Sequence, residues 1–94
     1  MAKYYRLADG NLIKAEPLDE EGRTFKATEF AYCGERGLVV DYIYGCLTKN
    51  TLSTLAYLGG QELDPTHLEA IRMNETLNQY YEGYMEEIDY GYAC

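Results

Sequence analysis

Basic side chains are scarce in this sequence, and its second half has almost none. The 94 residues hold 8 Lys and Arg against 16 Asp and Glu, which gives a formal charge of −8. Proteins that bind a nucleic-acid backbone or an anionic membrane place Lys and Arg against the phosphates. We therefore expect no direct binding to nucleic acid or membrane. No apolar run approaches the roughly 20 residues that a membrane-spanning helix needs.

The residue types that build catalytic and metal sites are also few. Ser53 is the only serine and His67 the only histidine, while Cys33, Cys46 and Cys94 lie far apart in the sequence. A nucleophile needs a base within reach and a third group to orient that base, and nothing in the spacing suggests such a set. A structural zinc site needs four ligands in short paired spacings. We expect no metal, no cofactor and no enzymatic activity.

Three cysteines are an odd number, which is unlike the even count of a secreted disulfide framework. Cys33 and Cys46 lie within apolar runs, so we expect both to be reduced and buried as small apolar side chains in the cytoplasm. We expect Cys94, the last residue, to be exposed. The alternatives are a metal site or a reactive thiol.

Two hairpins are predicted in the first half of the chain. The β-prone runs 4–7 and 12–16 flank Asp9-Gly10-Asn11, and Asp-Gly between such runs is a strong hairpin signal. Pro17 ends the second run because it cannot donate to a strand ladder. Residues 25–33 and 38–44 flank a loop at 34–37 and predict a second hairpin. The alternative is a short helix over residues 29–33, with Thr28 as its N-cap.

Two helices are predicted in the second half. Thr48 or Asn50 caps a short helix that ends at Gly59-Gly60. A long helix begins after Asp64-Pro65, or at a capping box formed by Thr66 and Glu69, and runs towards residue 88. The predicted fold is therefore one α+β domain over residues 1–94, with a small antiparallel sheet of two hairpins, a short helix and a longer C-terminal helix.

The apolar positions of the long helix do not form one stripe. At about 100° per residue, Leu68 and Ile71 fall opposite the larger cluster. That cluster consists of Leu77, Tyr80, Tyr81, Tyr84 and Ile88. The pattern predicts either a bend near residue 74 or apolar contacts on two sides of the helix.

Charge is distributed very unevenly along the chain. Residues 1–50 hold 7 basic and 8 acidic side chains, a net charge of −1, whereas residues 51–94 hold 1 basic and 8 acidic side chains, a net charge of −7. A solvated acidic face would explain part of this excess. However, clustered like charges repel one another, so such an uneven distribution also indicates a surface for a basic partner.

Eleven tyrosines are more than so small a core can bury with every hydroxyl satisfied. We expect Tyr5, Tyr42 and Tyr44 to pack within the sheet. Tyrosines and acids alternate near the C-terminus, where rigid aromatic anchors and acidic neighbours suit a protein interface. The predicted partner-binding residues are Tyr81, Glu82, Tyr84, Glu86, Glu87, Asp89, Tyr90 and Tyr92. The alternative is a helix packed on the sheet by its tyrosines, in which case the interface would lie around Glu62, Glu69 and Glu75.

In size, charge and lack of catalytic groups, the chain resembles the small acidic inhibitors that phages and mobile elements direct at nucleic-acid enzymes, the DNA-mimic and anti-CRISPR class. The resemblance implies a non-enzymatic inhibitor that occupies the basic groove of a nucleic-acid-binding protein. The alternative is a structural or assembly protein, a homo-oligomer that buries its aromatic surface between copies.

Overall fold

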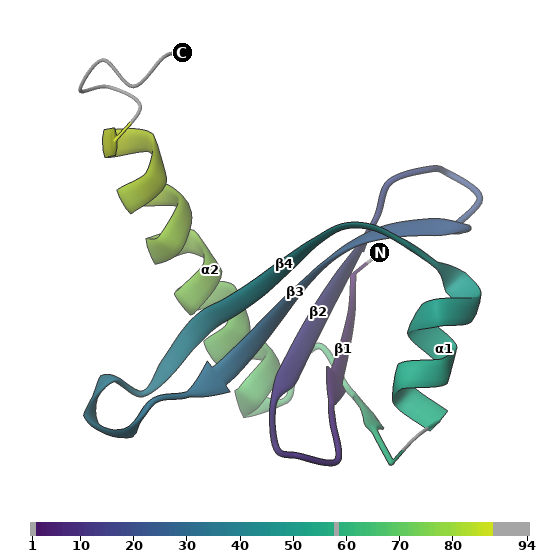
Figure 1. Cartoon of the computed structure of the whole chain (residues 1–94), viewed down its shortest axis with the longest axis horizontal. Helices are drawn as coiled ribbons and strands as arrows, with labels where there is room; N and C mark the ends of the chain where they lie inside the picture. The colour runs from purple at the N-terminus through teal and green to yellow at the C-terminus, as the bar shows by residue number, and fades with distance from the viewer. Residues whose placement is uncertain (1, 58, 88–94) are drawn as a thin grey trace.

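The computed structural model describes residues 2–57 and 59–87, with residues 55–57 and 83–87 described by their backbone alone. Five strands form one antiparallel sheet in the order β4-β3-β2-β1-β5 (Figure 1). The strands are β1 (Lys3–Arg6), β2 (Leu12–Pro17), β3 (Thr24–Tyr32), β4 (Leu38–Thr48) and β5 (Gln61–Leu63). The helices are α1 (Lys49–Tyr57) and α2 (Leu68–Glu87), and a 3₁₀ turn covers Gly34–Arg36. The predicted α+β fold is confirmed.

The first hairpin joins β1 to β2, as predicted. Its turn is wider than a two-residue turn: the Gly10 N–H donates to the Leu7 carbonyl at 3.0 Å, and the Leu7 N–H donates to the Asn11 carbonyl at 2.8 Å. Gly10 has a φ of 92°, which favours glycine at this position. Pro17 is the last residue of β2, in agreement with the prediction.

The second hairpin joins β3 to β4, so the strand interpretation of residues 29–33 is confirmed and the helical alternative is wrong. The pairing runs from Thr24↔Thr48 to Tyr32↔Leu38. Two irregularities interrupt it on β4, one at Asp41 and one between Tyr44 and Leu47. Such bulges bend a strand and increase its twist.

The helix starts are only partly as predicted. Thr48 caps α1, since its Oγ1 accepts the Thr51 N–H at 3.2 Å. The long helix begins later than Asp64-Pro65: the N–H of Glu69 donates to Nδ1 of His67 at 3.0 Å, and α2 starts at Leu68. Asp64 instead holds the preceding turn through the Thr66 N–H at 2.8 Å. β5 was not predicted; it pairs with β1 through Tyr5↔Glu62.

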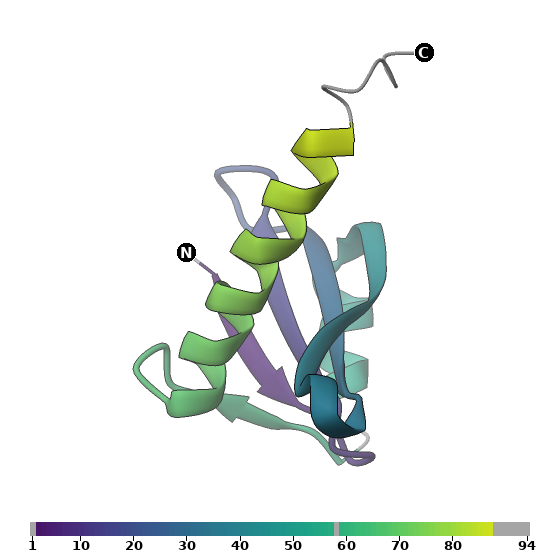
Figure 2. The same cartoon turned by 90° about the vertical axis from the view of Figure 1, so that its left-hand side faces the viewer.

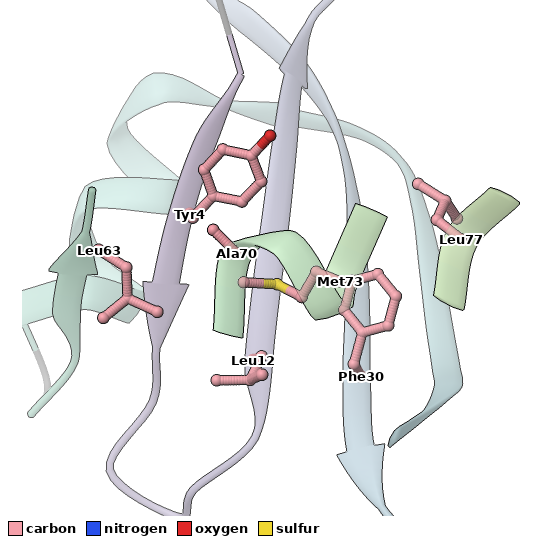
Figure 3. Close-up of a cluster of buried hydrophobic side chains, with 7 residues drawn as sticks. All are labelled: Tyr4, Leu12, Phe30, Leu63, Ala70, Met73 and Leu77. Carbon is pink, nitrogen blue, oxygen red and sulfur yellow. The ribbon is translucent and has the colours of Figure 1, made fainter. Parts of the chain in front are cut away.

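The two helices cover opposite faces of the sheet (Figures 1 and 2). Because neighbouring strand residues point to opposite faces, Tyr4 lies under α2 and Tyr5 lies on the α1 side. The cluster under α2 consists of Tyr4, Leu12, Phe30, Leu63, Ala70, Met73 and Leu77 (Figure 3). The cluster on the α1 side consists of Tyr5, Ile13, Ala15, Phe25, Ala27 and Leu52.

The apolar contacts predicted on two sides of the long helix are wrong for its described side chains. α2 is continuous from Leu68 to Glu87, and its buried residues Ala70, Met73 and Leu77 lie on one face. Leu68 and Ile71 remain exposed to solvent. Among the described side chains of α2, at residues 68–82, the buried apolar residues therefore lie on one side, and Leu68 and Ile71 are exposed on the other.

Three expectations about burial in the second hairpin are wrong. Cys33 and Cys46 are exposed, and so is 58% of Tyr42. Cys33 follows the end of β3, and Cys46 falls in the second irregularity of β4. Tyr42 lies on an edge strand, where only one neighbouring strand covers it. Tyr5 is buried as predicted, and Tyr44 is half-buried.

Candidate functional site

The predicted partner-binding residues occupy the end of α2 and the segment after it. Tyr81 and Glu82 are described fully, whereas Tyr84, Glu86 and Glu87 are described as backbone positions of α2. Asp89, Tyr90 and Tyr92 lie outside the described residues. Both views show the last turns of α2 running beyond the sheet (Figures 1 and 2). This end of the helix is therefore displayed rather than covered by the strands.

Tyr81 fixes the second half of α2 to the sheet. Its half-buried ring packs against the cluster under α2, and the Lys26 ammonium lies 4.9 Å from the ring centroid. Lys26 also donates a hydrogen bond to the Tyr81 hydroxyl, and this bond raises the pKa of Lys26. The neighbouring Tyr80 is 41% exposed and contacts Tyr81 edge-to-face. Tyr81 thus contributes to helix packing, while Tyr80 lies at the surface.

The acids of α2 differ in what they face. Glu75 and Glu82 are exposed, and a spacing of seven residues places them on one line of the helix. The position of Glu86, four residues further on, continues this line. We call Glu75 and Glu82 the acidic face of α2. No ion pair among the described residues includes either of them or the exposed Glu62 on β5.

Glu69, by contrast, is turned towards the sheet. Nε of Arg6 donates to its Oε1 at 2.9 Å, and the Tyr32 hydroxyl donates to its Oε2 at 2.8 Å. Burial acts to raise the pKa of Glu69, but the hydrogen bonds from Arg6 and Tyr32 outweigh it, so the pKa is lowered. Glu69 therefore joins α2 to β1 and β3 and is not available to a partner, whereas Glu62 and Glu75 are.

Several basic side chains of the sheet are used within the molecule. Arg6 pairs with Glu69, Lys14 with Glu16 at 3.2 Å, and Arg23 with Asp19 at 3.5 Å. Lys26 lies against Tyr81. The described ion pairs therefore occupy three of the seven basic side chains of the first half.

The residues considered for catalysis and metal binding are dispersed. Ser53 lies on α1 and His67 at the start of α2, so they belong to elements on opposite faces of the sheet. Nδ1 of His67 already accepts the Glu69 N–H. Among the described side chains, at residues 2–54 and 59–82, no three His, Cys, Asp or Glu are grouped closely enough to hold a metal ion.

One surface feature was not predicted at all: a groove between β4 and α2. It is lined by Arg36, Leu38, Val40, Arg72, Thr76 and Gln79. The sequence offers one weak signal, because Arg72 is the only basic residue of the acidic half. Its approach to Arg36 depends on how α2 crosses the sheet, which no local pattern encodes.

Comparison with protein-family models, curated proteins and solved structures gives no match. Neither helix of the described chain has the length and apolar character needed to cross a membrane.

Proposed function

We propose that this protein is a non-enzymatic binding module that inhibits a nucleic-acid-binding protein of the cytoplasm by occupying its basic groove. The observation that carries the proposal is the acidic face of α2, where Glu75 and Glu82 point into solvent on a helix that runs beyond the sheet. The residues after Glu82 add three further acids and three tyrosines to this end of the chain.

The packing of α2 supports this role because it presents the acids on a fixed support. The Tyr4 hydroxyl and the Asn74 side chain are hydrogen-bonded, with Asn74 Nδ2 donating at 3.1 Å, and the Tyr81–Lys26 contact holds the next two turns. A pre-ordered surface loses little conformational entropy on binding. Its acids would steer a basic partner and raise the association rate, most strongly at low salt.

The first experiment identifies the partner and tests the mode of inhibition. The chain is used as bait in a nuclease-treated lysate of its native host, and proteins that elute at raised salt are identified by mass spectrometry. A purified partner is then assayed for nucleic-acid binding in a gel shift. We expect the chain to displace nucleic acid from the partner, with inhibition that weakens as salt rises. A partner whose nucleic-acid binding is unaffected would contradict the proposal.

A pair of charge variants tests the acidic end of the chain, from Glu82 onward. Changing Glu82, Glu86, Glu87 and Asp89 to their amides should slow association with the partner about tenfold and flatten its salt dependence. The matched control changes Glu20, Glu21, Glu35 and Asp41, which alters the net charge equally on other elements. Equal effects of the two variants would show that only the total charge matters.

The same purified chain tests the alternative of a structural homo-oligomer. Its mass in solution is measured at low and high salt, and we expect a monomer in both. A stable oligomer whose mass is the same at low and high salt would favour the alternative, because the burial of apolar surface is little affected by screening.

A further inference from the structure

The β4 edge of the sheet is open next to the groove. β4 pairs with β3 and ends the strand order. The Cys33 N–H donates to the Gly37 carbonyl at 2.8 Å, so these two residues form a hydrogen-bonded pair. Hydrogen-bonded and non-hydrogen-bonded pairs alternate along an antiparallel ladder. Tyr32↔Leu38 and Phe30↔Val40 are therefore non-hydrogen-bonded pairs, in which Leu38 and Val40 direct their N–H and C=O groups away from β3. Their side chains pack on the α2 side.

The groove between β4 and α2 lies along this edge. Two adjoining hollows of about 400 and 420 Å³ share Arg36, Leu38, Thr76 and Gln79. Val40 and Tyr80 line the second hollow, so its floor is partly apolar. An open strand edge beside such a groove matches the recognition of extended peptides by strand addition, where the main chain supplies affinity and alternate side chains enter pockets.

The charge of the groove indicates which end of an extended peptide would bind there. Arg36 and Arg72 line the first hollow, at the end where β4 begins, and Glu75 also lines it. No ion pair in the described part of the chain includes either arginine. Two guanidinium groups against one carboxylate leave this spot positive in a chain of charge −8. It is therefore complementary to a carboxylate.

We propose that this groove binds the free C-terminus of an extended segment from another protein, added antiparallel to β4. Antiparallel addition continues the pattern of the sheet and places the last residue of the peptide opposite the start of β4, beside Arg36 and Arg72. The irregularity at Asp41 limits the regular open edge to residues 38–40. This length fits the last three residues of a peptide and is short for pairing with β4 of a second, equally acidic copy. The proposal does not depend on the function proposed above.

The test uses a peptide of alternating apolar residues, fluorescein-GSGTVTV, with a free C-terminus, and an amidated copy of it. We expect the free peptide to bind in fluorescence anisotropy and the amidated peptide to bind at least tenfold more weakly, because a charge-assisted hydrogen bond is lost. In ¹⁵N-labelled protein, amide shifts should centre on Leu38, Val40 and Thr76. No binding at about 1 mM peptide, or shifts centred elsewhere, would overturn the proposal.

Two further comparisons separate the parts of the site. Arg36→Gln with Arg72→Gln should abolish the preference for the free carboxylate, while the control Arg23→Gln with Lys49→Gln removes the same charge elsewhere and should keep it. A peptide N-methylated at the valine opposite Val40, two residues before its C-terminus, should lose binding, because that residue can no longer donate a hydrogen bond to the Val40 carbonyl at the edge of β4. An equal loss of the preference for the free carboxylate in both double variants would overturn the carboxylate site. If the protein forms a dimer and dilution shifts the amide signals of Leu38 and Val40, a second copy of the chain occupies the edge.

Discussion

Glu69 connects three elements through one carboxylate. Arg6 of β1 and Tyr32 of β3 both donate hydrogen bonds from the sheet to this carboxylate on α2. Glu69→Gln should lower the free energy of unfolding by about 1 kcal/mol, a modest value because Arg6 is partly exposed. The measurement is urea unfolding at pH 7, with the exposed Glu75→Gln as the control that should change little.

The pH dependence of this variant follows from the lowered pKa of Glu69. The stabilisation is present above the ordinary carboxyl pKa of about 4.3 and is lost as the pH falls through the lower folded value. The difference in the free energy of unfolding between the wild type and Glu69→Gln should therefore be largest at pH 7 and should disappear at acid pH. A difference that persists unchanged at acid pH would contradict an ionic role.

The cysteines give a second residue-scale prediction. Cys33 and Cys46 are exposed, so in a Cys94→Ser variant both should react with a thiol reagent without denaturant. Their rates should rise little when urea is added, because access is already open. Labelling that requires unfolding would contradict their exposed positions.

At the scale of elements, α2 is held on the sheet by a line of side chains that includes Tyr81. Tyr81→Ala should destabilise the protein by about 1–2 kcal/mol, since it removes a half-buried ring. Tyr80→Ala, on the adjacent exposed ring, should change stability by less than about 0.5 kcal/mol. Thermal and urea unfolding of the two variants give the comparison.

Tyr81→Phe separates the ring from its hydroxyl. It keeps the packing but removes the hydrogen bond from Lys26, so its stability should lie between those of the wild type and Tyr81→Ala. Equal destabilisation by Tyr80→Ala and Tyr81→Ala would show that the two rings do not differ in their packing.

The connection from α1 to β5 depends on Gly59. Its φ is 107°, and a Cβ added there would lie 2.9 Å from Cβ of Ala8 in the first hairpin. Gly59→Ala should therefore destabilise the protein by more than about 1 kcal/mol. Gly45→Ala is the matched control, because nothing lies within 4 Å of its added Cβ and its φ is not positive. Similar stability of the two variants in urea would contradict this account.

At the scale of the whole molecule, a charge of −8 makes self-repulsion significant. Raising NaCl from about 0.01 M to 0.1 M shortens the screening length from roughly 30 Å to 10 Å. The urea midpoint should therefore rise with salt, and it should rise less in the variant with amides at residues 82, 86, 87 and 89. A midpoint that falls with salt would show that ion pairs such as Arg6–Glu69 outweigh the repulsion.

Local signals in the sequence determined the two hairpins and the cap of α1. These signals are Asp9-Gly10, the loop at 34–37 and Thr48. Each acts on residues within a few positions of itself, so its effect can be predicted without the rest of the chain. The charge difference between the two halves is likewise a property of the sequence alone. These features predict the α+β fold and a concentration of negative charge in the second half of the chain.

Tertiary structure decided the features that depend on distant neighbours. The three residues of β5 form a strand because β1 offers them an edge, and the position of β4 at the other edge exposes Tyr42. Glu69 and Glu75 are chemically alike, yet Arg6 and Tyr32 donate hydrogen bonds to the first, whereas the second is exposed at the surface. Burial and pairing depend on which strands and helices meet, and that information is spread over the whole chain rather than held in any one segment.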